Sequence, residues 1–339
     1  MRSNTFGTAY SLTTFGESHG LAIGGVIDGC PAGFVLDKSL IEKELSRRKP
    51  GKNAVMSTRN EPDEVEFLSG LFEGKTTGAP IAFIIRNKDV KTSDYENIKD
   101  VFRPSHADFT YQEKYGIRDY AGGGRGSART LLPCVVAGAI AKQILAFQGI
   151  EVLSDVVQIG EERCEGFSNE DIERILSRFR ADKDTVGAVV RGTIKNAPVG
   201  LGEPAFQKFN AVLAHAMMTI NAAKGFEIGE GFNAARMKGS ECNDEFTFDG
   251  GRIRTKTNHS GGVQGGITNG EDIVFRVAFK PIPSVMQPQQ TIDIHGDAVT
   301  LEIQGRHDVC VVPRVVPIVE AMAAIVTLDF ILLKKCNKI

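Results

Sequence analysis

The sequence predicts an α+β protein made of two similar units, each a sheet with helices packed against it. In the first unit, an apolar run at residues 21–27 is followed by a turn with proline and glycine and then by a helix that ends near residue 48. The same order recurs in the second half, where a strand at residues 186–194 precedes a helix at residues 206–220. With 339 residues and 42% hydrophobic content, the chain can fill one large core, so we expect a single domain over residues 1–339.

Composition excludes several classes of protein. Forty basic and forty-two acidic residues give a net charge of -2, which provides no global field for binding nucleic acid or an anionic membrane. The six cysteines are scattered without a CxxC pair, and no histidine stands at zinc-ligand spacing, so we expect reduced thiols, no metal site and a cytoplasmic location. The start of the chain lacks the apolar core of a signal peptide. The most apolar segment, residues 315–333, is interrupted by Pro317, Glu320 and Asp329, which favours a buried helix over a membrane span.

The stretch before the first of these strands contains a candidate catalytic histidine. His19 follows Ser18 and is bracketed by Gly16 and Gly20, so a titratable imidazole lies on backbone that can turn sharply and approach a ligand. The strand at residues 21–27 would hold this histidine at the lip of a rigid element. The alternative is a glycine turn whose histidine merely caps the strand, and the stretch alone does not decide between them.

The first helix ends with two arginines. Asp37 is suited to cap its start, and the Lys-Pro-Gly sequence at residues 49–51 ends it. Arg47 and Arg48 therefore fall in the last turn, where the helix dipole favours cations. They serve either as simple end caps or as a clamp for an anion, and the sequence leaves both interpretations open.

Two further strands, at residues 66–70 and 79–85, are followed by a stretch with little periodicity at residues 87–120. A structureless stretch of that length inside a compact protein is usually functional. It contains Arg103 and a second histidine, His106, close to a proline.

A glycine-rich loop at residues 121–129 runs directly into an apolar helix at residues 131–147. Its small residues would let backbone N–H groups surround an anion at a helix start, and Arg125 and Arg129 add positive charge. The loop lacks the order of a Walker motif and the spacing of a dinucleotide fingerprint. A flexible linker is the alternative interpretation.

The second half supplies further loops between regular elements. A strand at residues 152–159 precedes a helix capped by Asn169, and we expect His215 in a later helix to have a packing role rather than a catalytic one. Loops rich in exposed backbone polar groups follow at residues 221–225, 258–266 and 280–284. Just before the last helix, Arg306 and Asp308 stand two residues apart, so an extended segment would point both side chains to one face.

These motifs together resemble one family in order and spacing. The three signature blocks of the chorismate synthase family are matched by residues 16–20, 124–129 and 306–313. Further similarity covers residues 47–51, 103–108, 221–225 and 258–262, so the resemblance extends over essentially the whole chain. Ordered blocks of this length are highly specific, whereas a lone glycine loop would not be.

The resemblance implies a β-α-β sandwich fold, a homotetramer and a lyase activity. The reaction would be the anti-1,4-elimination of phosphate and the C6 hydrogen from 5-enolpyruvylshikimate 3-phosphate, which gives chorismate. This is the last common step of the shikimate pathway to aromatic amino acids. Reduced FMN would be required without net redox change, and we expect its reduction by an external source such as NADPH with a separate flavin reductase.

The resemblance also implies roles for particular residues. His19 would donate a proton to the substrate phosphate, His106 would protonate the flavin at N1, and Asp308 near flavin N5 would relay the C6 hydrogen. The anionic groups of the substrate would be bound by Ser18, Arg48, Arg103, Arg129 and Arg306, because guanidinium groups bind carboxylate and phosphate bidentately. The flavin would be held by Arg48, Arg125, Gly126, Ser127, Asn221, Ala222, Gly265, Lys280, Pro281, Ile282, Pro283, Ser284 and Arg306.

Two departures from the family pattern stand out. Ala54 replaces an arginine that many members have, which removes one anion contact unless Lys52 or Arg59 substitutes for it. Thr130 stands where an acidic residue is frequent, and Gly126 where serine commonly lies. We expect these changes to tune affinity without abolishing activity.

Two other classes of function remain in competition. A phosphotransferase acting on a small phosphorylated metabolite would use the glycine-arginine loop, but it would need magnesium ligands and a nucleotide, and no kinase-like motif set is present. A non-catalytic binder of anionic polymers would need more positive charge than this chain carries.

Overall fold

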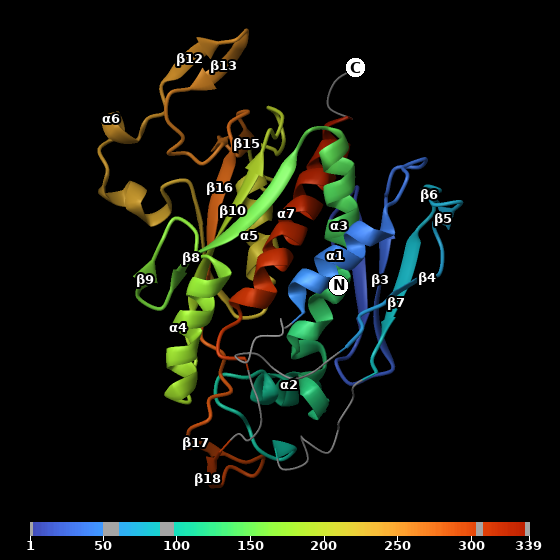
Figure 1. Cartoon of the computed structure of the whole chain (residues 1–339), viewed down its shortest axis with the longest axis vertical. Helices are drawn as coiled ribbons and strands as arrows, with labels where there is room; N and C mark the ends of the chain where they lie inside the picture. The colour runs from blue at the N-terminus through green and yellow to red at the C-terminus, as the bar shows by residue number, and fades with distance from the viewer. Residues whose placement is uncertain (1–2, 50–60, 89–97, 303–307, 336–339) are drawn as a thin grey trace.

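The computed structural model describes residues 3–49, 61–88, 98–302 and 308–335, and within them two five-stranded sheets face each other (Figure 1). The first sheet has the order β1 (Thr5–Phe6), β2 (Ser11–Gly16), β3 (Ala22–Asp28), β7 (Ile81–Arg86) and β4 (Val65–Phe67). The second has the order β11 (Ala223–Ile228), β16 (Ile273–Phe279), β10 (Ala188–Lys195), β8 (Glu151–Ile159) and β9 (Glu162–Arg163). Neighbouring strands are antiparallel in both sheets. Because antiparallel sheets tolerate one solvated face, each needs a cover on its inner face only.

Three helices provide that cover: α1 (Lys38–Arg48), α3 (Leu132–Phe147) and α7 (Val312–Lys334), which lie between the sheets (Figure 1). α3 contacts β2 and β3 of the first sheet, and α7 contacts β8 and β10 of the second. Alternate residues of β7 and β10 are buried, so one face of each strand points into the helical layer. A continuous hydrophobic cluster runs from one sheet through the helices to the other. The fold is the β-α-β sandwich that the resemblance implies.

The long apolar helices belong to this core. By length and composition, α7 and residues 128–147 are each apolar enough to cross a membrane, but 89% and 78% of their apolar segments are buried inside the fold. α7 packs against α1, α3, α5 (Phe209–Met218) and the second sheet. The prediction of a buried helix at residues 315–333 is therefore confirmed.

A buried carboxylate joins the layers. Glu320 of α7 is 3% exposed and accepts from both terminal nitrogens of Arg47 on α1, at 2.6 and 2.8 Å. It also accepts from Lys142 on α3 at 2.6 Å and from the backbone N–H of Ser154 on β8 at 3.2 Å. Because these partners come from two helices and a strand, the network fixes the helical layer against the second sheet. The sequence left open whether Arg47 has a structural role at the helix end or binds an anionic ligand, and this network gives it the structural role.

A second carboxylate of α7 reaches the first sheet. The side chain of Asp329 accepts from the backbone N–H groups of Thr8, Ala9 and Tyr10, at 3.0, 2.6 and 2.9 Å. These residues form the turn between β1 and β2. One helix is thus hydrogen-bonded to both sheets.

The remaining elements surround the sandwich. They are the helices α2 (Asp108–Tyr115), α4 (Asn169–Ala181) and α6 (Gly239–Cys242), the 3-10 turns η2 (Ala121–Gly126), η3 (Ala128–Leu131) and η4 (Gly231–Arg236), and the hairpins β5–β6 (Leu71–Phe72, Lys75–Thr76), β12–β13 (Phe246–Asp249, Arg252–Thr255), β14–β15 (Val263–Gln264, Ile267–Thr268) and β17–β18 (Gln289–Ile292, Ala298–Leu301). In Figure 1, β12–β13 stands away from the body at one end of the molecule, and α2 lies toward the other end.

Three sequence predictions differ from the structure. The stretch at residues 87–120 contains α2, a short and mostly polar helix that leaves little apolar periodicity to detect. α4 is capped by Ser168, whose hydroxyl accepts from a first-turn N–H, rather than by Asn169. α5 begins at Phe209, and Phe206 is 95% exposed outside it.

Candidate active site

A cavity of about 450 Å³ opens beside the start of α7, where loops from both halves of the chain meet. Its volume lies in the range typical of small-molecule sites, about 300–1,000 Å³. It is lined by the loop before α2, the glycine loop of η2, the start of β11, the loop after β16 and the first turns of α7. The predicted site residues on its wall are Arg103, His106, Gly126, Ser127, Asn221, Ala222, Lys280, Ile282, Pro283 and Asp308.

The glycine loop brings His19 against this wall. Gly122, Gly123 and Gly124 have φ angles of 63°, 77° and 50°, a left-handed run that residues with side chains rarely adopt. A Cβ added to Gly122 would lie 1.8 Å from Nδ1 of His19. Gly122 itself lines the cavity, so the imidazole lies directly behind it. The glycine loop therefore forms part of the cavity wall, and the alternative of a flexible linker does not hold.

Asn87 connects the turn that carries His19 to Arg129. Its amide group donates to the carbonyls of Glu17 at 3.1 Å and Gly20 at 2.7 Å, on either side of the histidine. Its carbonyl oxygen accepts from Nε of Arg129 at 2.7 Å. The histidine and the arginine, 110 residues apart in numbering, are therefore held by one side chain.

Arg48 and Arg129 are buried guanidinium groups behind the glycine loop. Arg129 donates to Asp63 at 2.8 Å, and Arg48, which is 4% exposed, donates to the carbonyl of Ala128 at 2.8 Å. Burial and the neighbouring guanidinium groups lower the pKa of Arg48 to about 9. Nε of Arg48 and Nη2 of Arg129 are buried without a hydrogen-bond acceptor among the described residues. Because such donors are costly to leave unmatched, this position favours an anionic ligand, and Arg48 fits the clamp interpretation.

The loop before α2 and the segment after β16 hold His106 between them. Nε2 of His106 lies 3.1 Å from Oγ of Ser284, and Nζ of Lys280 donates to the carbonyl of Ser105 at 2.9 Å. Burial, and after it repulsion from Lys224, lowers the pKa of Lys280. Two lysines that repel each other at the edge of a cavity make that edge favourable for an anion.

Two side chains hydrogen-bond to backbone carbonyls of the glycine loop, Asn221 from the second half of the chain and Thr130 from the turn that follows the loop. Nδ2 of Asn221 donates to the carbonyl of Gly126 at 2.9 Å, which joins two of the predicted flavin-binding segments. The hydroxyl of Thr130 donates to the carbonyls of Ser127 at 2.7 Å and Arg125 at 3.2 Å. Thr130, which departs from the family pattern, therefore stabilises the loop by a neutral hydrogen bond.

Asp308 lines the cavity immediately before α7. It is paired with Arg314, which stands in the first turn of that helix and also lines the cavity. A carboxylate of the site is thus anchored to an element of the core.

Several predicted residues lie beside the cavity rather than on its wall. His19, Arg48, Arg129, Pro281 and Ser284 are each next to residues that do line it, and Ser18 precedes His19 in the same turn. The guanidinium group of Arg125 turns away toward the first sheet, where it donates to Thr14 at 2.8 Å and to the carbonyl of Gly16 at 3.2 Å. Lys52, Ala54, Arg59 and Arg306 lie outside the described residues.

Gly265 is separated from the cavity. The carbonyl of Gly266, its neighbour, accepts from the N–H of Phe209 at 2.8 Å, at the start of α5. Asn221, on the cavity wall, follows the end of that ten-residue helix, which spans about 15 Å. In Figure 1, β15 and α2 likewise lie toward opposite ends of the molecule. Within one chain, Gly265 is not brought to the other predicted flavin-binding residues.

Sequence reasoning missed residues on and behind the wall. Asp63 and Asn87 pair with Arg129, and Arg118, Lys224 and Arg314 line the cavity. Arg314 carried the clearest signal, because a cation in the first turn of an apolar helix opposes the helix dipole and needs a local partner. Arg118 stands in a stretch without periodicity and offered no such signal.

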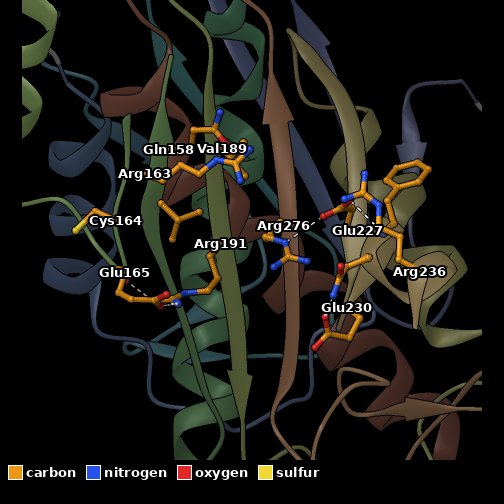
Figure 2. A pocket seen from close by; sticks show the side chains of 13 residues that line it. Gln158, Arg163, Cys164, Glu165, Val189, Arg191, Glu227, Glu230, Arg236 and Arg276 are labelled. Atoms are coloured by element: carbon orange, nitrogen blue, oxygen red, sulfur yellow. Dashed lines mark hydrogen bonds and ion pairs between the residues drawn. The ribbon is translucent and has the colours of Figure 1, made fainter. Parts of the chain in front are cut away.

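A larger and more open cavity of about 770 Å³ lies on the outer face of the second sheet (Figure 2). Two of its arginines already have carboxylate partners: Arg191 donates to Glu165 at 2.7 Å, and Arg276 donates to Glu227 at 3.1 Å. Its wall includes none of the predicted site residues that the structure describes. The smaller cavity, where those residues gather, is the candidate active site.

Known proteins resemble the chain along nearly its whole length. The family model described as chorismate synthase matches residues 10–332. A chorismate synthase of Christiangramia forsetii is 54% identical with 100% of both chains covered, and one of Parabacteroides distasonis is 52% identical with 99% of both covered. A crystal structure of chorismate synthase matches with a TM-score of 0.77 and 30% identity, covering 97% of this chain and 93% of the other. The chain therefore belongs to the chorismate synthase family, a family of lyases that act on phosphates.

Proposed function

We propose that the chain catalyses the anti-1,4-elimination of phosphate and the C6 hydrogen from 5-enolpyruvylshikimate 3-phosphate, which gives chorismate, with reduced FMN as cofactor. The observation that carries this proposal is the convergence of distant motif blocks. His106, Asp308 and the glycine loop line one cavity, and His19 lies against its wall. The proposal makes this protein the enzyme of the last common step of the shikimate pathway to aromatic amino acids.

The cations around the cavity suit the charges of this substrate, which carries a phosphate and two carboxylates. The buried donors of Arg48 and Arg129 lack acceptors among the described residues, and oxygen atoms of the phosphate would supply them. We therefore assign the phosphate to the side of the cavity where these two arginines lie with Ser18 and His19. Arg306 remains a predicted ligand of the substrate and the flavin.

The residues of the wall also fit a flavin. The lining includes the apolar side chains of Leu131, Ile282, Val311 and Val315, which suit an aromatic ring system, and Lys224 and Lys280, which suit a phosphate group. Reduced FMN would supply the electron that begins C–O cleavage and recover it at the end of the reaction. The residues that would hold it are Arg48, Gly126, Ser127, Asn221, Ala222 and the segment at residues 280–284, with the backbone of Arg125.

The side chains of the protein would carry the protons. His19 would protonate the leaving phosphate, which offsets the charge that develops on it. His106 would hold a proton for flavin N1, and the contact of its Nε2 with Ser284 would fix the orientation of the imidazole. Asp308 would receive the C6 hydrogen, with Arg314 holding the carboxylate in place.

We also propose a cytoplasmic homotetramer that receives reduced flavin from an external reductant such as NADPH with a flavin reductase. Because Gly265 lies outside the cavity within one chain, it can contact the flavin only if a second copy brings it there. Light scattering after size-exclusion chromatography tests the assembly. A fully active monomer would contradict both the tetramer and the role of Gly265.

Turnover without oxygen tests the function. Purified protein given reduced FMN and 5-enolpyruvylshikimate 3-phosphate should release inorganic phosphate and form a product with the absorbance of a conjugated diene. Absence of turnover under dithionite would contradict the proposal. Removal of magnesium with EDTA should leave the rate unchanged, whereas phosphate transfer that requires magnesium and a nucleotide would favour a phosphotransferase instead.

A further inference from the structure

Asp108 is a buried carboxylate shared between two guanidinium groups on the wall of the active site. It is 6% exposed and is the first residue of α2. Its Oδ2 accepts from Nε of Arg103 at 2.7 Å and from the backbone N–H of the same residue at 3.1 Å, and its Oδ1 accepts from Nη2 at 2.8 Å. On the other side, Nη1 of Arg118 lies 3.2 Å from Oδ1. All three residues line the cavity.

Arg118 is fixed from behind. Its Nη2 donates to the carbonyls of residues 98, 99 and 101, and its guanidinium group lies over the ring of Phe102, 5.7 Å from the ring centroid. It cannot rotate without losing these contacts, so it is a rigid support for the carboxylate of Asp108. Arg103 instead faces the glycine loop, where its Nη2 lies 3.9 Å from the position of a Cβ on Gly123.

The contacts of Asp108 leave one edge of the Arg103 guanidinium group for another anion. Asp108 occupies the edge formed by Nε and Nη2. The edge formed by Nη1 and Nη2 remains for a second carboxylate, since a planar guanidinium group presents two such edges. A fixed plane is what makes a bidentate contact specific, because little rotamer freedom is then lost on binding.

The net charge of the three residues is positive by one unit. Burial opposes ionisation of Asp108, but hydrogen bonds and charge from Arg103, with Arg118 beside them, outweigh it and hold the pKa of the carboxyl below its usual value. Two cations against one anion match the single charge of a carboxylate better than the double charge of a phosphate. Arg129 is paired with Asp63 and lies 3.9 Å from Glu61, so at Arg48 and Arg129 it is the buried donors without a hydrogen-bond acceptor among the described residues, and not net charge, that favour the phosphate.

We propose that Asp108, supported by Arg118, is a positioning residue: it fixes the guanidinium plane of Arg103, already a predicted ligand of the substrate, so that the free edge of Arg103 binds a carboxylate. The inference rests on the proposed function and adds to it the anchoring of one substrate carboxylate. The competing explanation is that Asp108 stabilises α2 alone, as an acidic residue at a helix start. That role would change the stability of the protein without a selective effect on substrate binding.

Asp108→Asn separates these explanations, because the amide keeps the size of the side chain but loses the charge and one acceptor. We expect the KM for the substrate to rise roughly 10- to 100-fold, with kcat changed by less than about threefold. The Kd of FMN and the inhibition constant of inorganic phosphate should stay at wild-type values. Glu113→Gln, on the exposed side of the same helix, is the matched control and should behave as wild type.

Because Asp108 is proposed to act through Arg103, the two substitutions should not add. In an Arg103→Gln background, Asp108→Asn should raise the KM by less than about twofold further. If circular dichroism shows Asp108→Asn to be unfolded, Arg118→Lys replaces it, and we expect a rise in KM of roughly 3- to 10-fold from the loss of its planar support.

The outcomes distinguish this inference from the proposed function. Wild-type turnover with an unchanged KM in Asp108→Asn would overturn the inference, and so would a lower melting temperature without a change in KM. Weaker inhibition by inorganic phosphate would overturn it too, because it would place the phosphate at Arg103. Lack of turnover in the wild type would count against the proposed function. Calorimetric binding of the substrate would then test the inference, with an expected loss in Asp108→Asn of roughly 10-fold or more.

Discussion

Arg314 holds Asp308 through both carboxylate oxygens: its Nε lies 2.6 Å from Oδ2 and its Nη2 lies 3.1 Å from Oδ1. The pair brings together the first turn of α7 and the loop before it, and both residues line the active-site cavity. A cation in the first turn opposes the helix dipole, and the adjacent carboxylate offsets that cost. The most buried helix of the sandwich therefore orients a reactive group of the site.

Replacing this bidentate contact should slow the chemical step. In Arg314→Lys, a single ammonium group keeps the charge but no longer fixes the plane of the Asp308 carboxylate. We expect kcat to fall roughly 10- to 100-fold, with a smaller change in the KM for the substrate. Anaerobic single-turnover kinetics measures the effect. Arg178→Lys, in an exposed pair with Glu162, should retain the wild-type rate, and equal rates in the two variants would show that orientation of Asp308 does not matter.

Asn87→Ala should disconnect His19 from Arg129. The substitution removes two donors to the carbonyls around the histidine and the acceptor for Nε of the arginine. Loss of a buried partner of a charged group costs about 1–3 kcal/mol, so we expect kcat/KM to fall roughly 10- to 100-fold. Steady-state kinetics without oxygen measures it. Asn233→Ala, which removes a surface hydrogen bond to Glu230, is the control; a similar loss there would point to a general effect on the fold.

Gly122→Ala should displace His19, whereas Gly149→Ala should not. Both glycines have positive φ angles, 63° and 75°, so both substitutions carry backbone strain of about 1–2 kcal/mol. A Cβ on Gly149 would meet nothing within 4 Å, but one on Gly122 would lie 1.8 Å from the imidazole. We expect the two variants to lose similar stability in urea, with activity retained in Gly149→Ala and reduced at least about 100-fold in Gly122→Ala. An active Gly122→Ala enzyme would argue against a catalytic histidine at this position.

Glu320→Gln should destabilise the sandwich in a pH-dependent way. Burial opposes ionisation of Glu320, but Arg47 and Lys142 outweigh it and hold the pKa of its carboxyl below the usual value. A lowered pKa contributes stability above the unfolded-state pKa, about 4.3, and that contribution is lost as the pH falls through the folded-state value. At pH 7 we expect a loss of about 1–3 kcal/mol, because a buried acceptor of charged hydrogen bonds is neutralised, while the partly exposed Arg47 and Lys142 keep Glu44 as a second partner.

Urea unfolding at neutral and acidic pH measures this loss. The difference between Glu320→Gln and wild type should begin to shrink as the pH falls below the unfolded-state pKa of about 4.3, and it should vanish below the lowered folded-state pKa, where the wild-type carboxyl is protonated as well. Glu66→Gln, in an exposed pair with Arg86, should cost about 0–1 kcal/mol at any pH. A difference for Glu320→Gln that is independent of pH would mean that packing rather than charge explains its effect.

The layers of the fold were predictable because their periodicity is local. β10 largely alternates between apolar and polar residues because one of its faces is buried in the core. α7 is apolar along most of its length because it is buried on nearly all sides. The two arginines at the end of α1 show where such reasoning stops. The helix dipole acts on both equally, but the helical rotation between neighbours points Arg47 to Glu320 and Arg48 to the carbonyl of Ala128.

The active site was predictable mainly through the family resemblance. No local pattern indicates that residue 19 meets residue 122, or that residue 106 meets residue 284, because these contacts depend on how the sheets and loops close in space. The supporting residues were missed for the same reason. Asn87 reads as an ordinary loop asparagine until its three hydrogen bonds are seen.

The position of α7 in the chain has a consequence for biosynthesis. Glu320 and Asp329 connect this helix to both sheets, yet residues 312–334 leave the ribosome after every strand of those sheets. Until then α3 can cover part of the first sheet, but the second sheet lacks the helix that packs on β8 and β10. We expect the growing polypeptide to depend on chaperones that shield apolar surface, and to reach its final compactness only after the helix has emerged.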